Sequence, residues 1–480
     1  MLKKIHGLLE KLNIPKWLGI ILALLIILRI PSFFEPYSYG DEMIYLTLGQ
    51  GIRQGVPLYS GLHDNKPPLL YLAAALAENL FWFKAILLFW MLGTTIVFWK
   101  LVERFFPNKQ SLHKASMIIF ALLTTLPLLE GNIVNAELFF IGPIILGFYL
   151  FLTLKHNFKN LFLVGALFSL ASLFKIPAGF DLLVLFFLLL IQGINKLTFK
   201  KAGFILLGFL IPITLSFIWF ALKGSLPQYI TAAFLQNLGY VSSWRGKNLP
   251  LIIRGGIMLL GLGLLYFLRR RLSKPFILTS AWLLTSLFAT TLSERPYPHY
   301  LLQAVAPIAI LTGMLFSLKN LEQSLVVIPL ALAAFVPFYF KFWYYPTGAY
   351  YQRFINFTLG RISKAQYLNS FSPRVSRNYE IASFLSQSCS PKGKVFVWST
   401  DAPTIYALSR RLPPVKYVAN YHIKDFYRKD LLVKDLAATK PKFIVITYDE
   451  SYLTQAVPLL RESYLLINKI EDGEIWSRID

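Results

Sequence analysis

Long stretches of apolar residues without charge recur along the chain, and short polar segments separate them. Residues 17–28 (WLGIILALLIIL) and 182–191 (LLVLFFLLLI) are examples, and neither has a polar face at helical spacing. A helix needs about 20 such residues to cross ~30 Å of hydrocarbon. The pattern therefore predicts an α-helical polytopic membrane protein.

Clusters of lysine and arginine indicate how these runs pair up. Basic residues precede the first run (Lys3, Lys4, Lys11) and recur between later ones, and basic loops stay in the cytoplasm. If every basic loop is cytoplasmic, the chain has about eleven spans, with the N-terminus in the cytoplasm and the C-terminus outside. The predicted spans are 17–34, 84–101, 114–130, 135–154, 160–175, 177–194, 201–222, 251–268, 275–292, 300–318 and 323–340.

Residues 67–82 (PPLLYLAAALAENLFW) are apolar but short, and they carry Glu78 and Asn79. If they crossed, every later basic loop would lie outside the cell, against the charge rule. We therefore expect a helix in the outer interface, with Trp82 and Lys84 among the lipid headgroups.

The character of the sequence changes after residue 340. Segments 395–399 and 443–447 are typical of buried strands, and helical segments at 379–388, 401–409 and 425–438 lie around them. This predicts a transmembrane domain at 1–340, whose first outer loop is 35–83, and a small α/β extracytoplasmic domain at 341–480.

The composition agrees with a membrane protein and argues against a nucleic-acid-binding protein and a disulfide-linked one. Apolar residues make up 56% of the 480, and the net charge is +24. Basic residues in cytoplasmic loops account for that charge, so no nucleic-acid partner is expected. The single cysteine, Cys389, excludes an internal disulfide. Residues 1–30 resemble a signal peptide, but no small-residue cleavage site follows, which favours a retained first span.

Candidate catalytic residues lie in the first outer loop. Asp41 and Glu42 follow the first span, and a carboxylate there could take the proton of an acceptor hydroxyl. Adjacent helical residues point about 100° apart, so only one of the two can face a given substrate. The other interpretation is an acid pair at a helix N-terminus, favoured by the helix dipole.

The segment HDNKPP follows, and its prolines restrict the backbone next to Lys66. An outward-facing lysine there could bind a phosphate, or it could contact lipid headgroups. His63 and Asp64 could hold a metal, although a lone histidine more often makes an ordinary hydrogen bond. Glu137, at the mouth of a span, could coordinate a metal, pair with a cation, or belong to a capped first turn. A divalent cation stays an open question.

Several cationic or polar side chains are expected toward the outer ends of spans. Arg29 lies about 18 Å along its helix from Trp17, which predicts an anionic partner: Asp41, Glu42 or a ligand phosphate. The others are Lys175, Arg295, His299 and Tyr300. Cations around two or three acids suit a lipid-phosphate-sugar donor, because they stabilise the departing phosphate. Each cation alone could instead be an interface anchor.

These residues resemble the GT-C glycosyltransferases, in the bacterial branch related to protein O-mannosyltransferases and lipid A aminoarabinose transferases. The resemblance covers most of 1–340 and, more loosely, the tail segment WSTDAPTIYALSRRLPP. It rests on Asp41-Glu42 with Tyr45, GVPLY at 55–59, KPPLLY at 66–71, NAELF at 135–139, LFK at 173–175 and HYLLQAVAP at 299–307.

The resemblance implies an inverting transfer in the cell membrane, from a polyprenyl-phosphate-linked sugar to an envelope lipid, glycan or protein on the outer face. It implies that Asp41 is the catalytic acid, that Lys66 contacts donor phosphate, and that Glu137 lies at the site mouth. Tyr59, His63 and Asp64 are expected at the same mouth. The chain contains no WWD-type motif, which disfavours N-glycosylation.

Three alternatives stay open. A flippase or transporter for lipid-linked sugars would distribute ionisable groups along interrupted helices, whereas here they collect at one face. A catalytically inactive scaffold of the same fold would differ only in activity. A polysaccharide polymerase or ligase would rely on outer-loop arginines instead of an acid pair.

Overall fold

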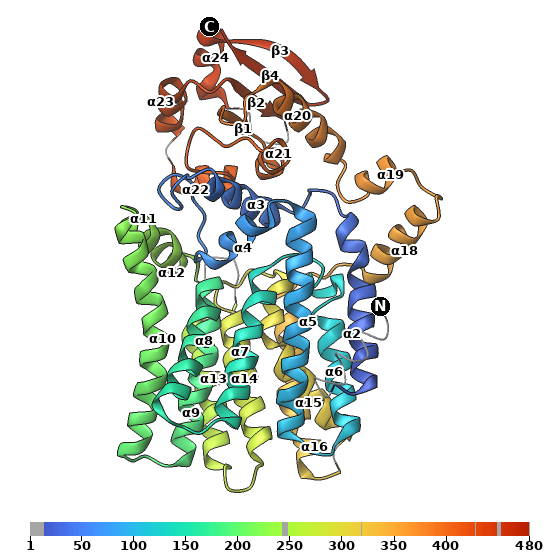
Figure 1. Ribbon diagram of the computed structural model, residues 1–480, viewed down its shortest axis with the longest axis vertical. Helices are drawn as coiled ribbons and strands as arrows, with labels where there is room; N and C mark the ends of the chain where they lie inside the picture. The colour runs from blue at the N-terminus through green and yellow to red at the C-terminus, as the bar shows by residue number, and fades with distance from the viewer. Residues whose placement is uncertain (1–13, 242–247, 318, 428, 449–452, 480) are drawn as a thin grey trace. The chain divides into compact units, whose positions relative to one another are not determined.

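The computed structural model describes residues 14–241, 248–317, 319–427, 429–448 and 453–479 (Figure 1). Lys3, Lys4 and Lys11, on which the predicted orientation of the N-terminus depends, lie outside these ranges. Contacts group the chain into two compact units. Unit 1 comprises residues 1–30, 86–218 and 237–347, and unit 2 comprises 31–85, 219–236 and 348–480.

Unit 1 is helical. Helix α5 (Leu80–Phe105) enters it from residue 86, and α10 (Lys196–Leu222) belongs to it as far as residue 218. The other elements are α2 (Lys16–Arg29), α6 (Gln110–Leu123), η2 (Pro127–Leu129), α7 (Ala136–Thr153), α8 (Phe158–Phe174), η3 (Ile176–Asp181), α9 (Leu182–Gln192), α12 (Gln236–Tyr240), α13 (Leu251–Phe267), α14 (Lys274–Thr290), η5 (Pro298–Ala304), α15 (Val305–Ser317), α16 (Leu321–Leu325) and α17 (Val327–Tyr339). Helix α7 packs on α8, and α13 packs on α14, with their axes roughly aligned in Figure 1.

The helical prediction is confirmed, since each of the eleven predicted spans overlaps a helix in the structure. Six of the described helices are long and apolar enough to cross a membrane, and Phe158–Phe174, Ile176–Gln192 and Leu251–Phe267 are shorter apolar helices. The chain is therefore a multi-pass membrane protein. The number eleven and the orientation of the termini stay predictions.

Two glycines let α8 and α10 approach closely. A Cβ at Gly165 would lie 2.0 Å from the carbonyl oxygen of Ile205, and one at Gly208 would lie 2.0 Å from that of Phe162. Neither neighbour is a flexible side chain that could move aside. Small residues at helix crossings are a usual basis of packing in membranes, where lipid chains are as apolar as the side chains.

Unit 2 combines residues 31–85 and 219–236 with the C-terminal part of the chain. Its elements are η1 (Ile30–Phe34), α3 (Gly40–Arg53), α4 (Leu69–Ala77), α11 (Leu226–Ile230), the π-helical turn η4 (Thr231–Leu235), α18 (Thr347–Thr358), α19 (Lys364–Asn369), α20 (Val375–Ser388), α21 (Ala402–Ser409), α22 (Asn420–Phe426), α23 (Lys429–Thr439), η6 (Thr454–Ala456) and α24 (Val457–Ser463), with strands given below. Helix α4 has nine residues, too few to cross a membrane, as predicted for 67–82.

The strands form one mixed sheet in the order β1-β2-β4-β3. Strands β1 (Val395–Trp398) and β2 (Phe443–Thr447) are parallel and fully buried, as the sequence predicted. Strand β2 also pairs antiparallel with β4 (Gly473–Arg478), which pairs with β3 (Tyr464–Ile470). The sequence analysis missed this hairpin, because most side chains of β3 are exposed and give no buried-strand pattern.

Replacing Gly208 by alanine should destabilise unit 1, because α8 and α10 must separate to admit the methyl group. Gly203 on the same helix has open space at its Cβ position, so it is the matched control. We expect Gly208→Ala to lower the thermal unfolding midpoint in detergent, and Gly203→Ala to leave it unchanged or raise it, since alanine favours helix by about 1 kcal/mol over glycine. Equal midpoints for the two variants would contradict the close crossing.

Candidate active site

The predicted site residues are divided between the two units. Unit 2 holds Asp41, Glu42, Tyr59, His63, Asp64 and Lys66, and unit 1 holds Arg29, Glu137, Lys175, Arg295, His299 and Tyr300. Each group is described within its own unit.

In unit 2, Asp41 and Glu42 lie in the first turn of α3, where the helix dipole favours negative charge. The Asp41 side chain is 33% exposed, and Tyr45, one turn further along, donates a hydrogen bond of 3.0 Å to its Oδ2. The Lys66 ammonium lies 3.7 Å from the same oxygen. Asp41 is thus an accessible carboxylate beside a cation.

Glu42 has a different environment. Its side chain is 2% exposed, and its Oε1 lies 2.6 Å from Nζ of Lys84, which is also 2.9 Å from Oε2 of Glu35. Tyr350 donates a 2.5 Å hydrogen bond to the other oxygen of Glu35. Lys84 is therefore buried between two carboxylates and not placed among headgroups as expected. Sequence reasoning missed it because a lysine near a span end usually marks the interface.

Two tyrosines hold the backbone of Lys66. Tyr59 donates to the Lys66 carbonyl at 2.9 Å, and the Lys66 amide donates to Tyr71 at 3.0 Å. Tyr71 in turn donates to Oδ2 of Asp64 at 2.8 Å. Burial raises the pKa of both tyrosines, which keeps their hydroxyls protonated as donors. The two hydrogen bonds hold the backbone of Lys66, which the prolines that follow it also restrict.

His63 lies at the contact between the first loop and the C-terminal part of unit 2. Its amide donates to the carbonyl of Lys416 at 2.8 Å, and its ring centroid is 5.6 Å from that of His422. The His422 ring nitrogen Nε2 lies 3.7 Å from Oδ1 of Asp64. Burial, followed by the nearby His422, lowers the pKa of His63 to about 4, and burial also lowers the pKa of His422. No three His, Cys, Asp or Glu side chains among the described residues are grouped to hold a metal ion.

Unit 1 contains a second polar cluster. Glu137, in the first turn of α7, forms an ion pair with Lys175, and its side chain is 3% exposed. The Lys175 ammonium lies 3.7 Å from the ring centroid of Tyr300. His299, next to Tyr300 in η5, pairs through Nδ1 with the carboxylate of Glu130. Sequence analysis did not single out Glu130, which stands at the end of the predicted span 114–130 and belongs to none of the motifs considered.

The remaining cations of unit 1 lie in separate surroundings. Arg29 is 2% exposed, and its guanidinium donates to the Thr124 carbonyl at 2.8 Å. Arg295 follows α14 in a loop where its amide donates to the hydroxyl of Ser293 at 3.4 Å. Their predicted roles in phosphate binding are not tested by these contacts.

Asp181 is a further buried acid that sequence reasoning missed. It is fully buried and accepts hydrogen bonds from Ser286 at 2.9 Å, Thr285 at 3.3 Å and Gln303 at 3.2 Å. Gln303 also donates to the Pro177 carbonyl at 3.1 Å. Asp181 therefore links η3, which directly follows Lys175, to α14 and to η5, which contains Tyr300.

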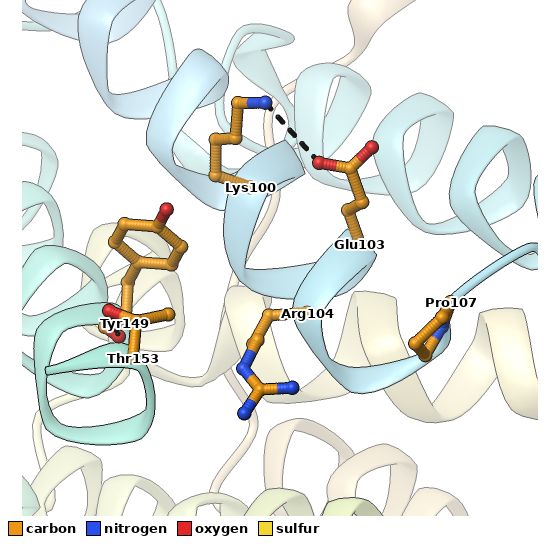
Figure 2. A pocket seen from close by; sticks show the side chains of 6 residues that line it. All are labelled: Lys100, Glu103, Arg104, Pro107, Tyr149 and Thr153. Atoms are coloured by element: carbon orange, nitrogen blue, oxygen red, sulfur yellow. Dashed lines mark hydrogen bonds and ion pairs between the residues drawn. The ribbon is translucent and has the colours of Figure 1, made fainter.

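Figure 2 shows a hollow in unit 1 at the end of α5 and α7, away in sequence from every predicted site residue. Lys100 and Glu103 form a 3.3 Å ion pair there, and the guanidinium of Arg104 donates to a carbonyl of α7. Basic residues at a helix end are typical of a lipid-headgroup anchor. None of the predicted site residues lines this hollow, so Lys100 and Glu103 are suitable control positions.

The fold of this chain is similar to that of solved membrane-protein structures. ArnT from Cupriavidus metallidurans bound to undecaprenyl phosphate aligns with a TM-score of 0.60 and 14% identity, over 97% of this chain and 98% of that chain. ArnT in the apo state aligns with a TM-score of 0.54 and 13% identity over the same shares. The chain has the GT-C fold. No protein-family model and no curated protein sequence matches.

The environment of His63 predicts an acid-sensitive unit 2. Since the folded pKa is about 4 and the unfolded value is near 6.5, the unfolded state binds more protons between these values. Stability should be complete above pH 6.5 and fall as the pH drops toward 4, by about 3 kcal/mol for this group. His63→Gln should flatten this dependence in urea unfolding. His156→Gln is the control, and an unchanged slope in His63→Gln would refute the assignment.

Proposed function

We propose that the chain is an inverting glycosyltransferase that moves a sugar from a polyprenyl-phosphate donor to an envelope lipid, glycan or protein on the outer face of the cell membrane. The observation that carries the proposal is the contrast between the two acids of α3. Asp41 is accessible and lies 3.7 Å from Lys66, whereas Glu42 is buried against Lys84.

The chemistry assigns a role to each group. Asp41 accepts the proton of the acceptor hydroxyl while that oxygen attacks the anomeric carbon from the face opposite the phosphate. The bond between the anomeric carbon and the phosphate oxygen breaks, and its electron pair leaves with the phosphate. No acid is required for this departure, because phosphate leaves without a proton, and one carboxylate base is sufficient for inversion. We assign Glu42 to holding the start of α3.

We assign the stabilisation of the departing phosphate to cationic side chains. Lys66 supplies a positive charge beside Asp41, and Lys175, Tyr300 and His299 form a cationic and polar cluster of their own in unit 1. Fixed positive charge in a place of low dielectric stabilises the phosphate as its charge grows. The ArnT structure with the higher TM-score is bound to undecaprenyl phosphate, which supports a polyprenyl-phosphate donor for this chain. Arg29 and Arg295 stay predicted ligands of the donor phosphate. Tyr59 and Asp64 belong to the hydrogen-bond network that holds the backbone of Lys66.

Metal chemistry enters no step of this proposal. The described side chains include no group of three metal-ligating residues at Glu137 or His63, the two positions considered from the sequence.

Asp41→Asn should abolish transfer while leaving the fold intact, because an amide of equal size replaces the base at a partly exposed position. We expect a loss of about 10²–10⁴-fold in the rate of undecaprenyl phosphate release from polyprenyl-phosphate-sugars of a bacterial envelope extract. Glu103→Gln, at an exposed carboxylate outside the site, is the matched control. A wild-type rate in Asp41→Asn would refute the assignment, and sugar-lipid translocation without release would favour the transporter alternative.

Lys66→Ala should impair use of the donor more than use of the acceptor, because the ammonium contacts donor phosphate in this proposal. Loss of a hydrogen bond to a charged group, about 1.5–3 kcal/mol, corresponds to roughly 10–100-fold in donor kcat/KM. Steady-state kinetics with each substrate varied in turn measures the effect, and Lys100→Ala is the control. A larger effect on the acceptor KM would count against this role.

A further inference from the structure

Glu130 occupies a backbone conformation that its residue type disfavours. It follows η2 with φ 58° and ψ 33°, in the left-handed region. A residue with a Cβ pays about 1–2 kcal/mol for that conformation, whereas glycine adopts it freely. The side chain is also 1% exposed, so it carries the cost of burial as well. A strained, buried glutamate at a turn therefore points to a use for its carboxylate.

That carboxylate contacts His299. Its Oε2 pairs with Nδ1 of the ring, and Asn135 donates to the same oxygen at 3.5 Å. His299 is itself 4% exposed, and its ring lies against those of Tyr297 and Tyr300, with centroids 5.6 and 4.7 Å away. The carboxylate and the two aromatic rings together fix the orientation of the imidazole.

Fixing Nδ1 determines what Nε2 can do. A carboxylate that accepts from Nδ1–H sets the tautomer and the ring direction, so Nε2 becomes the atom available to a ligand. Within the described ranges, Nδ1 is the ring nitrogen with a hydrogen-bond partner. Tyr300, which contacts His299, also contacts the Lys175 ammonium, so His299 belongs to the same cluster as that cation.

We propose that Glu130 is a positioning residue that aims His299 Nε2 at the phosphate of the polyprenyl-phosphate donor. The inference rests on the proposed function and adds to it the residue that makes His299 a phosphate ligand. When the imidazole carries both protons, Nε2–H donates to a phosphate oxygen while Nδ1–H donates to the Glu130 carboxylate. No covalent bond of the protein changes.

The first test measures retention of undecaprenyl phosphate against undecaprenol, its neutral analogue, by the purified full-length protein in nanodiscs. Glu130→Gln and Glu130→Gly should each bind undecaprenyl phosphate about tenfold more weakly, with undecaprenol retention unchanged. The glycine variant relieves the backbone strain, so its thermal midpoint separates a folding defect from a binding defect. Glu322→Gln, at another buried carboxylate of unit 1, is the matched control. Wild-type retention by both Glu130 variants would overturn the proposal.

The second test asks whether Glu130 acts through His299. If it does, adding His299→Ala to Glu130→Gln should weaken undecaprenyl phosphate binding little beyond His299→Ala alone, because the two changes remove one interaction. Independent, multiplicative losses would overturn the positioning role.

A third measurement separates this inference from the function it rests on. Nitrogen-15 spectra of labelled histidine, assigned with His299→Gln, should show Nδ1 of His299 protonated in the wild type and a changed tautomer distribution in Glu130→Gly. Unchanged His299 signals would overturn the positioning. Equal wild-type retention of undecaprenyl phosphate and undecaprenol would overturn the phosphate role and the proposed donor, whatever the spectra show.

Discussion

Burying a charge among apolar helices is costly unless an opposite charge accompanies it, and this constraint organises the polar interior of both units. Lys84 lies between Glu35 and Glu42, Arg254 lies 2.6 Å from Glu294, and Glu130 pairs with His299. Each pair joins segments distant in sequence. Each pair therefore links two segments within its own unit.

The different environments of Asp41 and Glu42 follow from that constraint. The two are adjacent on α3, so when one is drawn into the ion pair with Lys84, the other must point elsewhere. Asp41 stays partly exposed beside Lys66, whose own backbone is held by Tyr59 and Tyr71. A carboxylate and an ammonium that are held from several directions would lose little freedom on binding a substrate, as the proposed catalysis by preorganised charge requires.

Within unit 2, the C-terminal part of the chain packs against residues 31–85. Helix α3 packs against α4 and α21, and the Gln50 side chain donates to the Arg410 carbonyl. His63 joins the loop to the segment before α22. The small sheet contributes no candidate catalytic residue. Its buried core of Phe396, Trp398, Ile444 and Ile446 instead gives this part of the chain a rigid base.

The sequence by itself determined the helices, the two buried strands and the candidate residues at helix ends, because apolar periodicity, basic loops and short motifs are local signals. Tertiary structure decided what those residues contact. The burial of Lys84 against Glu35 and the pairing of Glu130 with His299 join residues that are 49 and 169 positions apart. The exposed strand β3 could not be predicted from the sequence either, because its pairing with β4 is what makes it a strand. These contacts depend on which opposite charge or hydrogen-bond partner the fold brings near, and a local sequence pattern carries no information about that.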